Sequence, residues 1–146
     1  MLMMNKYLAI SKISKIRNEV SEHIERELRH RGIEGLVVSH GNILDILYEH
    51  NGKLTMKEIG EGIDRSKSTV TQLVDRLLKA GYVTKESDLN DKRYSYIVLT
   101  EKGLSIKKDF VEISQNVIAT FFKDFKDDEI VILLSLLDRV IYNFEN

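Results

Sequence analysis

The stretch that decides the fold runs from Ser66 to Gly81 and reads SKSTVTQLVDRLLKAG. Its apolar residues recur at intervals of three and four, which is the spacing of one face of an α-helix. They are Val70, Leu73, Val74, Leu77 and Leu78. Ser66 can cap the start of this helix and Gly81 can end it. The pattern therefore predicts an amphipathic helix, from Ser66 to about Ala80, with one face in a core.

The opposite face of this helix is polar, and its first two turns hold no acidic residue. Short donors let a helix approach DNA closely, Gln72 can bond an adenine edge, and Arg76 can reach a phosphate or a guanine. A face that merely meets solvent usually mixes lysine with glutamate, so the absence of acids favours a major-groove recognition helix over that plain alternative. The candidate DNA contacts on this helix are Ser66, Lys67, Ser68, Thr69, Thr71, Gln72 and Arg76.

Three helices are predicted before this one, from Asn5 to about Arg31, from Ser39 to Asn51, and from Met56 to about Gly62. The first carries an apolar residue every three or four positions and stops at two glycines. Ser39 is the expected N-cap of the second helix. Thr55 followed three residues later by Glu58 is the signature of a capping box at the start of the third.

After Gly81 the apolar period changes from helical to alternating, which predicts a β-hairpin with strands at 82–85 and 94–99. The segment between them, 87–93, is rich in Asp and Asn and is typical of an exposed turn. Thr100 is the expected N-cap of a helix to about Lys123, and Asp127 that of the last helix. Two short helices, a polar-faced helix and a basic-tipped hairpin follow the order of a winged helix-turn-helix.

The last predicted helix is apolar on more than one face. A chain of 146 residues offers too few other elements to cover it together with the apolar stripe of the first helix. We therefore expect a homodimer, with the first and the last two helices interleaved across a two-fold axis; a helical core within one chain is the alternative. The expected regions are a dimerisation helix in 1–38, a DNA-binding lobe in 39–100 and dimerisation helices in 101–146.

Composition excludes several classes of protein. The chain holds no Cys, which rules out thiol catalysis and thiolate metal sites, and its 42% hydrophobic and 31% charged residues are those of an ordinary globular domain. No apolar run approaches the roughly 20 residues of a membrane span, so we expect a cytoplasmic protein with no membrane partner. Nothing resembles a nucleophile, a phosphate loop or a carboxylate pair, so we expect neither an enzyme nor a cofactor.

Net charge is −1, but residues 65–93 hold seven Lys or Arg against four acids, and residues 109–146 hold three against eight. This asymmetry assigns any binding of a polyanion to the middle of the chain.

The stretch from Thr55 to Gly103 resembles the core of the MarR (multiple antibiotic resistance regulator) family. The matching segments are TMKEIG at 55–60, SKSTVTQLVDRL at 66–77, KAGYV at 79–83, DLNDKR at 88–93 and LTEKG at 99–103. The tip, with an aspartate, a basic residue and an arginine followed six residues on by Leu99-Thr100, is its most specific part. Helices before and after the core also fit the family.

The resemblance implies a mainly α fold with a small β-hairpin wing, and a helical dimerisation region formed by the N- and C-terminal helices. It implies a sequence-specific regulator of transcription, a ligand-responsive homodimer that binds double-stranded DNA. We expect a homodimeric repressor that binds a pseudo-palindromic operator, and an activator is the alternative. The Arg93 side chain would enter the minor groove, and Asp91 would orient that side chain. Lys92 and Lys85 would add positive charge. Lys85 stands where the family commonly has arginine. A small anionic or phenolic effector would bind between the wing lobe and the dimer helices.

Two other readings of the residues remain open. One is a winged-helix protein-interaction module that does not bind an operator, and the other is a module that sequesters a small molecule. Some proteins of the family bind zinc near the joint between the lobe and the dimer helices, which His30 and His40 could approach. Since no second cluster of metal ligands follows in the chain, we expect no metal site.

Overall fold

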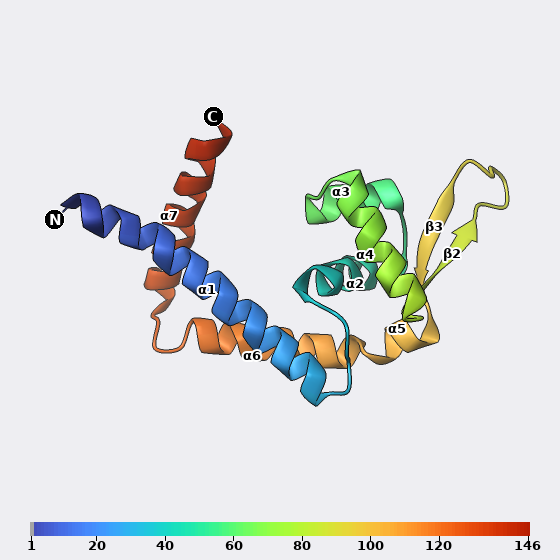
Figure 1. The fold of residues 1–146 in the computed structure, drawn as a ribbon, viewed down its shortest axis with the longest axis horizontal. Helices are drawn as coiled ribbons and strands as arrows, with labels where there is room; N and C mark the ends of the chain where they lie inside the picture. The colour runs from blue at the N-terminus through green and yellow to red at the C-terminus, as the bar shows by residue number, and fades with distance from the viewer. Residues whose placement is uncertain (1) are drawn as a thin grey trace. The chain divides into compact units, whose positions relative to one another are not determined.

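The computed structural model describes residues 2–146, with side chains from residue 5 onward. The fold is mainly helical with one small sheet, as the sequence predicts (Figure 1). The helices are α1 Leu2–His30, α2 Val38–Glu49, α3 Met56–Ile63, α4 Lys67–Lys79, α5 Glu101–Ser105, α6 Lys107–Phe121 and α7 Asp127–Glu145. The strands are β1 Lys53–Thr55, β2 Val83–Ser87 and β3 Ser95–Leu99. The chain divides into two compact units, Met1–Ser114 and Gln115–Asn146.

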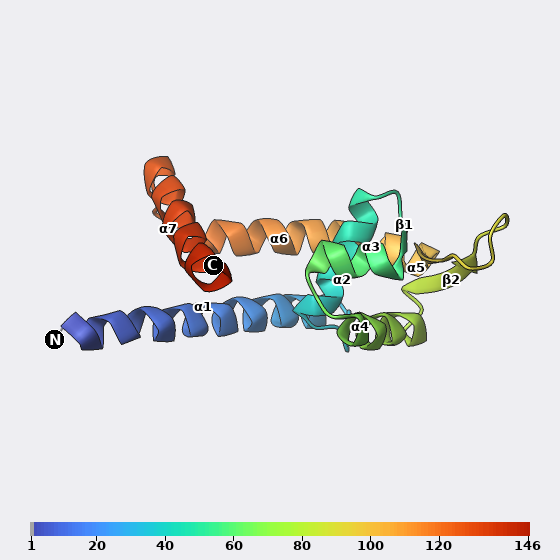
Figure 2. The ribbon, with the colours of Figure 1, turned by 90° about the horizontal axis from the view of Figure 1, so that it is seen from above.

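The first unit contains a lobe in which α2, α3 and α4 pack against the sheet. Its fully buried side chains come from each of these elements: Ile43, Leu44 and Leu47 of α2, Ile59 of α3, Val70, Val74 and Leu77 of α4, and Ile97 of β3. The apolar face predicted for α4 therefore lies in this core. In Figure 2, α4 lies at one edge of the lobe, and α2 and α3 both lie on the same side of it. This arrangement leaves the polar face of α4 in solvent.

The sheet has three antiparallel strands in the order β1-β3-β2. The predicted hairpin is confirmed, with Val83 opposite Leu99 and Ser87 opposite Ser95. β1 was not predicted, because three residues between two helices are too few to show an alternating pattern. It forms by pairing with β3, where Leu54 lies opposite Ile97.

Two predicted helix caps are wrong by one or two residues. α2 starts at Val38, so Ser39 lies inside its first turn, and the N-cap residue is Val37. Val37 has no capping side chain; instead its N–H donates to Nδ1 of His40, at 2.9 Å. α7 starts at Asp127 itself, and the N–H of Lys126 before it donates to Oε1 of Glu129.

The single helix predicted from Thr100 to about Lys123 is also wrong, because it breaks at Ile106 into α5 and α6. The Ser105 hydroxyl donates to the carbonyl of Lys102, which would otherwise accept the N–H of Ile106 in a continuous helix. The N–H of Ile106 bonds the carbonyl of Leu104 instead, and its side chain is buried. Thr100 does cap α5, since its Oγ1 accepts the N–H of Gly103 at 3.1 Å.

α1 ends where predicted, at two glycines with positive φ, Gly32 and Gly35. Beyond α1, Arg31 ties the end of this helix to the start of α6. Its Nη1 lies 3.1 Å from Asp109 and 2.6 Å from Glu112. In the second unit, α7 has no buried residue, and side chains such as Val131, at 67% exposure, and Phe144, at 89%, are open to solvent. Across the helices that the structure describes, none is both long and apolar enough to cross a membrane.

Candidate nucleic-acid interface

The N-terminus of α4 is capped as the sequence predicts. Ser66 Oγ accepts the backbone N–H of Thr69 at 3.3 Å and lies 3.2 Å from the Ser68 hydroxyl. It also donates to the Thr69 hydroxyl at 3.0 Å. These bonds fix a cluster of small hydroxyl groups at the positive end of the helix, where an approaching phosphate is favoured.

The candidate contacts on α4 lie on its open face. Lys67, Ser68, Thr71, Gln72 and Arg76 are exposed, and Thr69 is partly covered. The Thr71 hydroxyl donates to the carbonyl of Lys67 at 2.9 Å, so its methyl group and the lone pairs of its oxygen remain for a partner. On this face, the first acid is Asp75, in the third turn. The open surface of the first two turns is therefore polar and free of negative charge.

Arg76 does not extend away from the lobe. Its Nε donates to the carbonyl of Gly35 at 3.3 Å, in the connection between α1 and α2. The guanidinium covers Gly35 so closely that a Cβ there would overlap it, and the positive φ of Gly35 also disfavours a larger residue. Burial, and then the charge of Arg76, lower the pKa of His40. Arg76 thus links α4 to the α1–α2 connection.

At the tip of the hairpin, Asp91 and Arg93 form a bidentate ion pair. Nη2 of Arg93 lies 2.7 Å from Oδ2 of Asp91, and Nε lies 3.0 Å from Oδ1. Asp91 also accepts the backbone N–H of Arg93 at 3.0 Å. These bonds lower the pKa of the Asp91 carboxyl and raise that of the guanidinium. The Arg93 side chain is still 86% exposed, so it is held in direction yet open to a partner.

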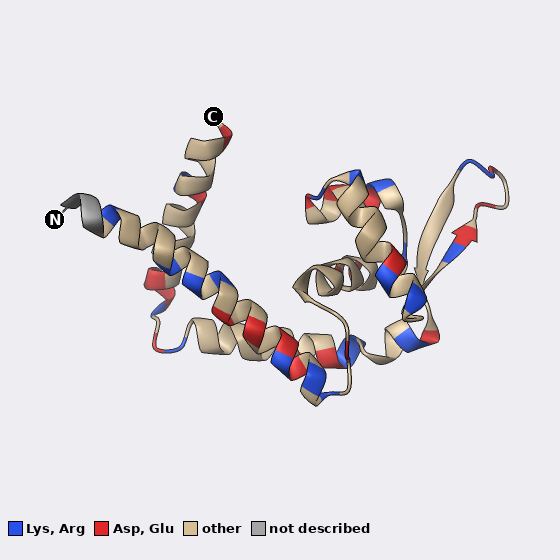
Figure 3. Ribbon diagram, viewed as in Figure 1, with Lys and Arg blue, Asp and Glu red and all other residues tan. Residues whose placement is uncertain are grey.

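The other charged candidates lie on the same hairpin. Lys85 is exposed on β2, opposite Ile97 of β3, and Lys92 is exposed at the tip. Figure 3 shows Lys and Arg in blue on α4 and on the hairpin with its loop. The structure thus brings the candidate residues into one lobe on two neighbouring elements, α4 and the β2–β3 hairpin.

Sequence reasoning missed three residues that shape this hairpin. Tyr96 of β3 donates its hydroxyl to Oδ2 of Asp88 at 3.1 Å, and Lys53 of β1 lies over the Tyr96 ring. The sequence placed Asp88 in an exposed turn, within the segment that resembles the MarR family, but gave this side chain no role. Its bonds from the N–H groups of Asn90 and Asp91, and then from Tyr96, lower its pKa. The position of Asp88 at the start of an Asp- and Asn-rich turn was the one available signal.

Among the described residues, no group of three or more His, Asp or Glu side chains could hold a metal ion. The Nδ1 of His40 accepts the N–H of Val37, which leaves only its other ring nitrogen for any ligand role. His30 is exposed near the end of α1.

The lobe and its hairpin define a winged helix-turn-helix protein, and comparisons with known proteins identify its family. The family model described as "MarR family" matches residues 34–93. The HTH-type transcriptional regulator SarZ of Staphylococcus aureus strain MRSA252 is 34% identical over 109 residues, which cover 73% of this chain and 71% of SarZ. The chain belongs to the MarR family of winged-helix transcriptional regulators, which are not enzymes.

Solved structures agree with this fold. The organohalide-sensing regulator RdhR-CbdbA1625, solved with 2,4-dichlorophenol, superposes with a TM-score of 0.82 at 24% identity, over 94% of this chain and 80% of that one. A mutant of MarR from E. coli, solved with operator DNA, superposes with a TM-score of 0.77 at 20% identity. The superposition covers 93% of this chain and 96% of that one. Against the first curated relatives the alignment spans only 60% to 63% of their length.

Proposed function

We propose that this protein is a homodimeric repressor that binds a pseudo-palindromic operator in double-stranded DNA. In this proposal α4 enters the major groove and the β2–β3 hairpin reaches the adjacent minor groove. Residues 39–100 form the DNA-binding lobe, and residues 1–38 and 101–146 supply the dimer contacts. The observation that carries the proposal is the Asp91–Arg93 pair, which holds an exposed guanidinium at the hairpin tip.

The chemistry of the two elements supports different roles in DNA binding. An arginine in a narrow minor groove gains from the negative potential there, and a carboxylate that restricts its rotamers reduces the entropy lost on binding. On α4, Gln72 has the donor and acceptor needed for an adenine edge, while Ser66, Lys67, Ser68, Thr69 and Thr71 suit phosphates, sugars or a thymine methyl. Lys85, Lys92 and Arg76 would add attraction to phosphates.

The exposed apolar side chains of α7 support the dimer. Large apolar surfaces left open in one chain are typical of an interface. A two-fold dimer carries two recognition helices, so it would read two half-sites about 34–36 Å apart. That spacing is about one turn of DNA.

A small anionic or phenolic effector would release the repressor. The similar regulator solved with 2,4-dichlorophenol makes a phenol the first probe. An effector that binds better to a dimer with misaligned recognition helices lowers DNA affinity by that difference in binding alone. If saturating 2,4-dichlorophenol leaves the affinity for the operator unchanged, this phenol is not the effector.

The experiment that tests DNA binding is selection of sites from random duplex DNA with the purified protein, followed by footprinting on the selected site. We expect an inverted repeat whose two half-sites are both protected. Failure to enrich any duplex would reject operator binding, and protection of one half-site alone would contradict the dimeric arrangement.

A further inference from the structure

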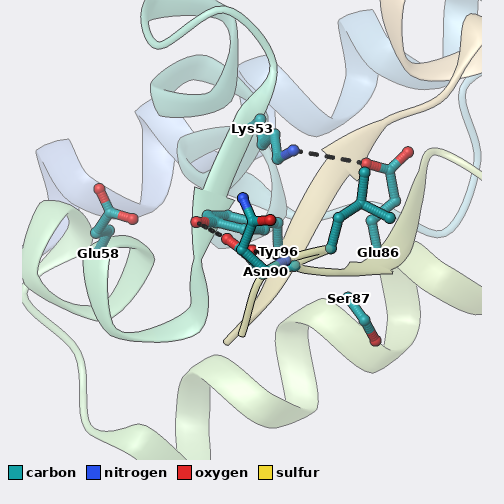
Figure 4. Close-up of a pocket in the computed structure, with 8 residues that line it drawn as sticks. Lys53, Glu58, Glu86, Ser87, Asn90 and Tyr96 are labelled. Carbon is teal, nitrogen blue, oxygen red and sulfur yellow. Dashed lines mark hydrogen bonds and ion pairs between the residues drawn. The ribbon is translucent and has the colours of Figure 1, made fainter. Parts of the chain in front are cut away.

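An open groove of about 840 Å³ lies beside the wing, and its residues come from five parts of the lobe (Figure 4). Lys53 is contributed by β1, Glu58 by α3 and Glu86 by β2, while Asp88 belongs to the hairpin loop. Tyr96 of β3 lies among them, so its side chain can contact both the sheet and the loop.

The Tyr96 ring is held by its neighbours on the sheet. Nζ of Lys53 lies 4.5 Å from the ring centre, where a cation is attracted by the aromatic face. The same Nζ is 3.7 Å from Oε2 of Glu86, the residue opposite Tyr96 on β2. With its ring fixed in this way, Tyr96 directs its hydroxyl at Oδ2 of Asp88, 3.1 Å away.

Asp88 connects the Tyr96 hydroxyl with the backbone at the tip of the hairpin. Its other oxygen, Oδ1, accepts the N–H of Asn90 at 2.8 Å and of Asp91 at 3.1 Å. Asp91 in turn accepts from the backbone and the guanidinium of Arg93. The two oxygens of one carboxylate therefore connect β3, through Tyr96, with the residue that holds Arg93.

We propose that Tyr96 is a positioning residue for DNA binding, which anchors the hairpin loop through Asp88 so that Arg93 points in a fixed direction. The inference rests on the proposed binding of DNA by Arg93. Tyr96 itself need not contact DNA.

The physical gain is preorganisation. Asp91 fixes the Arg93 side chain relative to the loop, but residues 88–94 can still move relative to the sheet. Two backbone bonds lie within this loop, from the N–H of Asp88 to the Tyr94 carbonyl at 2.9 Å and from the N–H of Tyr94 to the Asp91 carbonyl at 3.1 Å, and neither ties the loop to the body of the sheet. The Tyr96 hydroxyl adds a side-chain bond to a charged acceptor, and such bonds are stronger than neutral ones. A loop ordered before binding loses less entropy on DNA.

The test is Tyr96→Phe, which removes the hydroxyl and keeps the ring under Lys53. We expect affinity for the selected operator to fall about three- to tenfold, less than the full contribution of a hydrogen bond to a charged group, because the bond affects binding only through the order of the loop. The slope of log affinity against log salt should stay unchanged, because no phosphate contact is lost. In an Arg93→Ala background the same substitution should have no further effect, since its action passes through Arg93.

Tyr82→Phe is the matched control. Tyr82 is buried at the base of the hairpin, and its hydroxyl has no hydrogen bond to any residue that the structure describes. We expect operator affinity to be the same as in the wild type. Asp88→Asn should keep most of the affinity, because an amide oxygen can still accept the N–H groups of the turn and its NH₂ can donate to the Tyr96 oxygen. Asp88→Ala should lose at least as much as Tyr96→Phe.

The outcomes separate this inference from the function on which it rests. If Arg93→Ala weakens binding while Tyr96→Phe does not, the anchoring role is rejected and the DNA-binding role of the wing stands. If Tyr96→Phe weakens binding equally in the wild type and in Arg93→Ala, or lowers the melting temperature in parallel, Tyr96 acts on folding and the inference is rejected. If Arg93→Ala has no effect, both proposals for the wing fail.

Discussion

At the scale of single residues, Arg93 and Gln72 should affect DNA binding differently. We expect Arg93→Ala to weaken binding to every duplex and to lower the salt slope by about one, because one charged contact is lost. Gln72→Ala is the matched comparison. It should reduce the preference for the correct base mainly at one base pair of the operator, by about 1–3 kcal/mol of binding free energy. Titrations with the selected operator and its single-base variants, at several salt concentrations, measure both effects. Unchanged affinity in both variants would reject the assigned roles.

A second residue-scale prediction concerns Asp45 of α2, which is half-buried and has no ion-pair partner among the described residues. Burial, and then the charge of Glu49, raise its pKa to about 6. An unfolded chain has a pKa near 3.9 for aspartate, so the folded protein binds this proton more tightly. The contribution of Asp45 to stability therefore falls as pH rises from about 4 to about 6 and is constant above that.

Replacing this carboxyl with an amide removes the cost of its charge. We expect Asp45→Asn to be more stable than the wild type by about 1 kcal/mol at pH 7.5, a value reduced to allow for solvent around a half-exposed group. The advantage should disappear near pH 4. Urea unfolding at both pH values and at equal protein concentration measures it; an advantage of equal size at both would contradict the assignment.

At the scale of elements, the caps of the helices make a direct test. Ser66 caps α4, whereas Ser39 lies inside the first turn of α2 and caps nothing. We expect Ser66→Ala to lower the free energy of unfolding by about 1 kcal/mol and Ser39→Ala to change it by only a few tenths. Urea unfolding of the two variants measures the difference. A larger loss for Ser39→Ala would show that the predicted cap, and not the observed one, stabilises its helix.

The elements that sequence predicted well are those whose signals are local. The caps at Ser66 and Thr55 and the stop at Gly81 each depend on bonds within a few residues, so their patterns sufficed for α3 and α4. The predicted start of α2 was misplaced because its cap is of an unusual kind. The ring of His40 accepts the backbone N–H of Val37, and histidine is not one of the residue types, such as Ser, Thr, Asp and Asn, that commonly cap a helix. β1 was missed because its strand state depends on pairing with β3, more than forty residues further along the chain.

The candidate site divides in the same way. The turn that joins Asp91 to Arg93 spans two residues, and the sequence predicted their pairing. The contact of Arg76 with Gly35 and the contact of Lys53 with Tyr96 join residues 41 and 43 positions apart, so no pattern in either segment could reveal them. Both depend on how the elements pack, which the sequence of one chain specifies only through the fold as a whole.

At the scale of the whole molecule, the question is what covers α7. Leu134 and Ile141 are 52% and 54% exposed, and their spacing of seven places them on one face of the helix. Full burial of a Leu or Ile side chain gains about 1.5–3 kcal/mol, so covering the exposed half of each would gain about 1 kcal/mol. A second copy of the chain would provide that burial, and it would also set the distance between the two recognition helices.

We therefore expect the double variant Leu134→Glu, Ile141→Glu to be monomeric in sedimentation while its winged lobe stays folded, because two charges in a buried interface oppose association. Ser135→Glu, about 100° round the same helix, is the control and should remain dimeric. The monomer should bind the two-half-site operator far more weakly than the control, with the loss much smaller on a single half-site. A double variant that stays dimeric would mean that other surfaces hold the two copies together, and the spacing of the half-sites would then have to come from them.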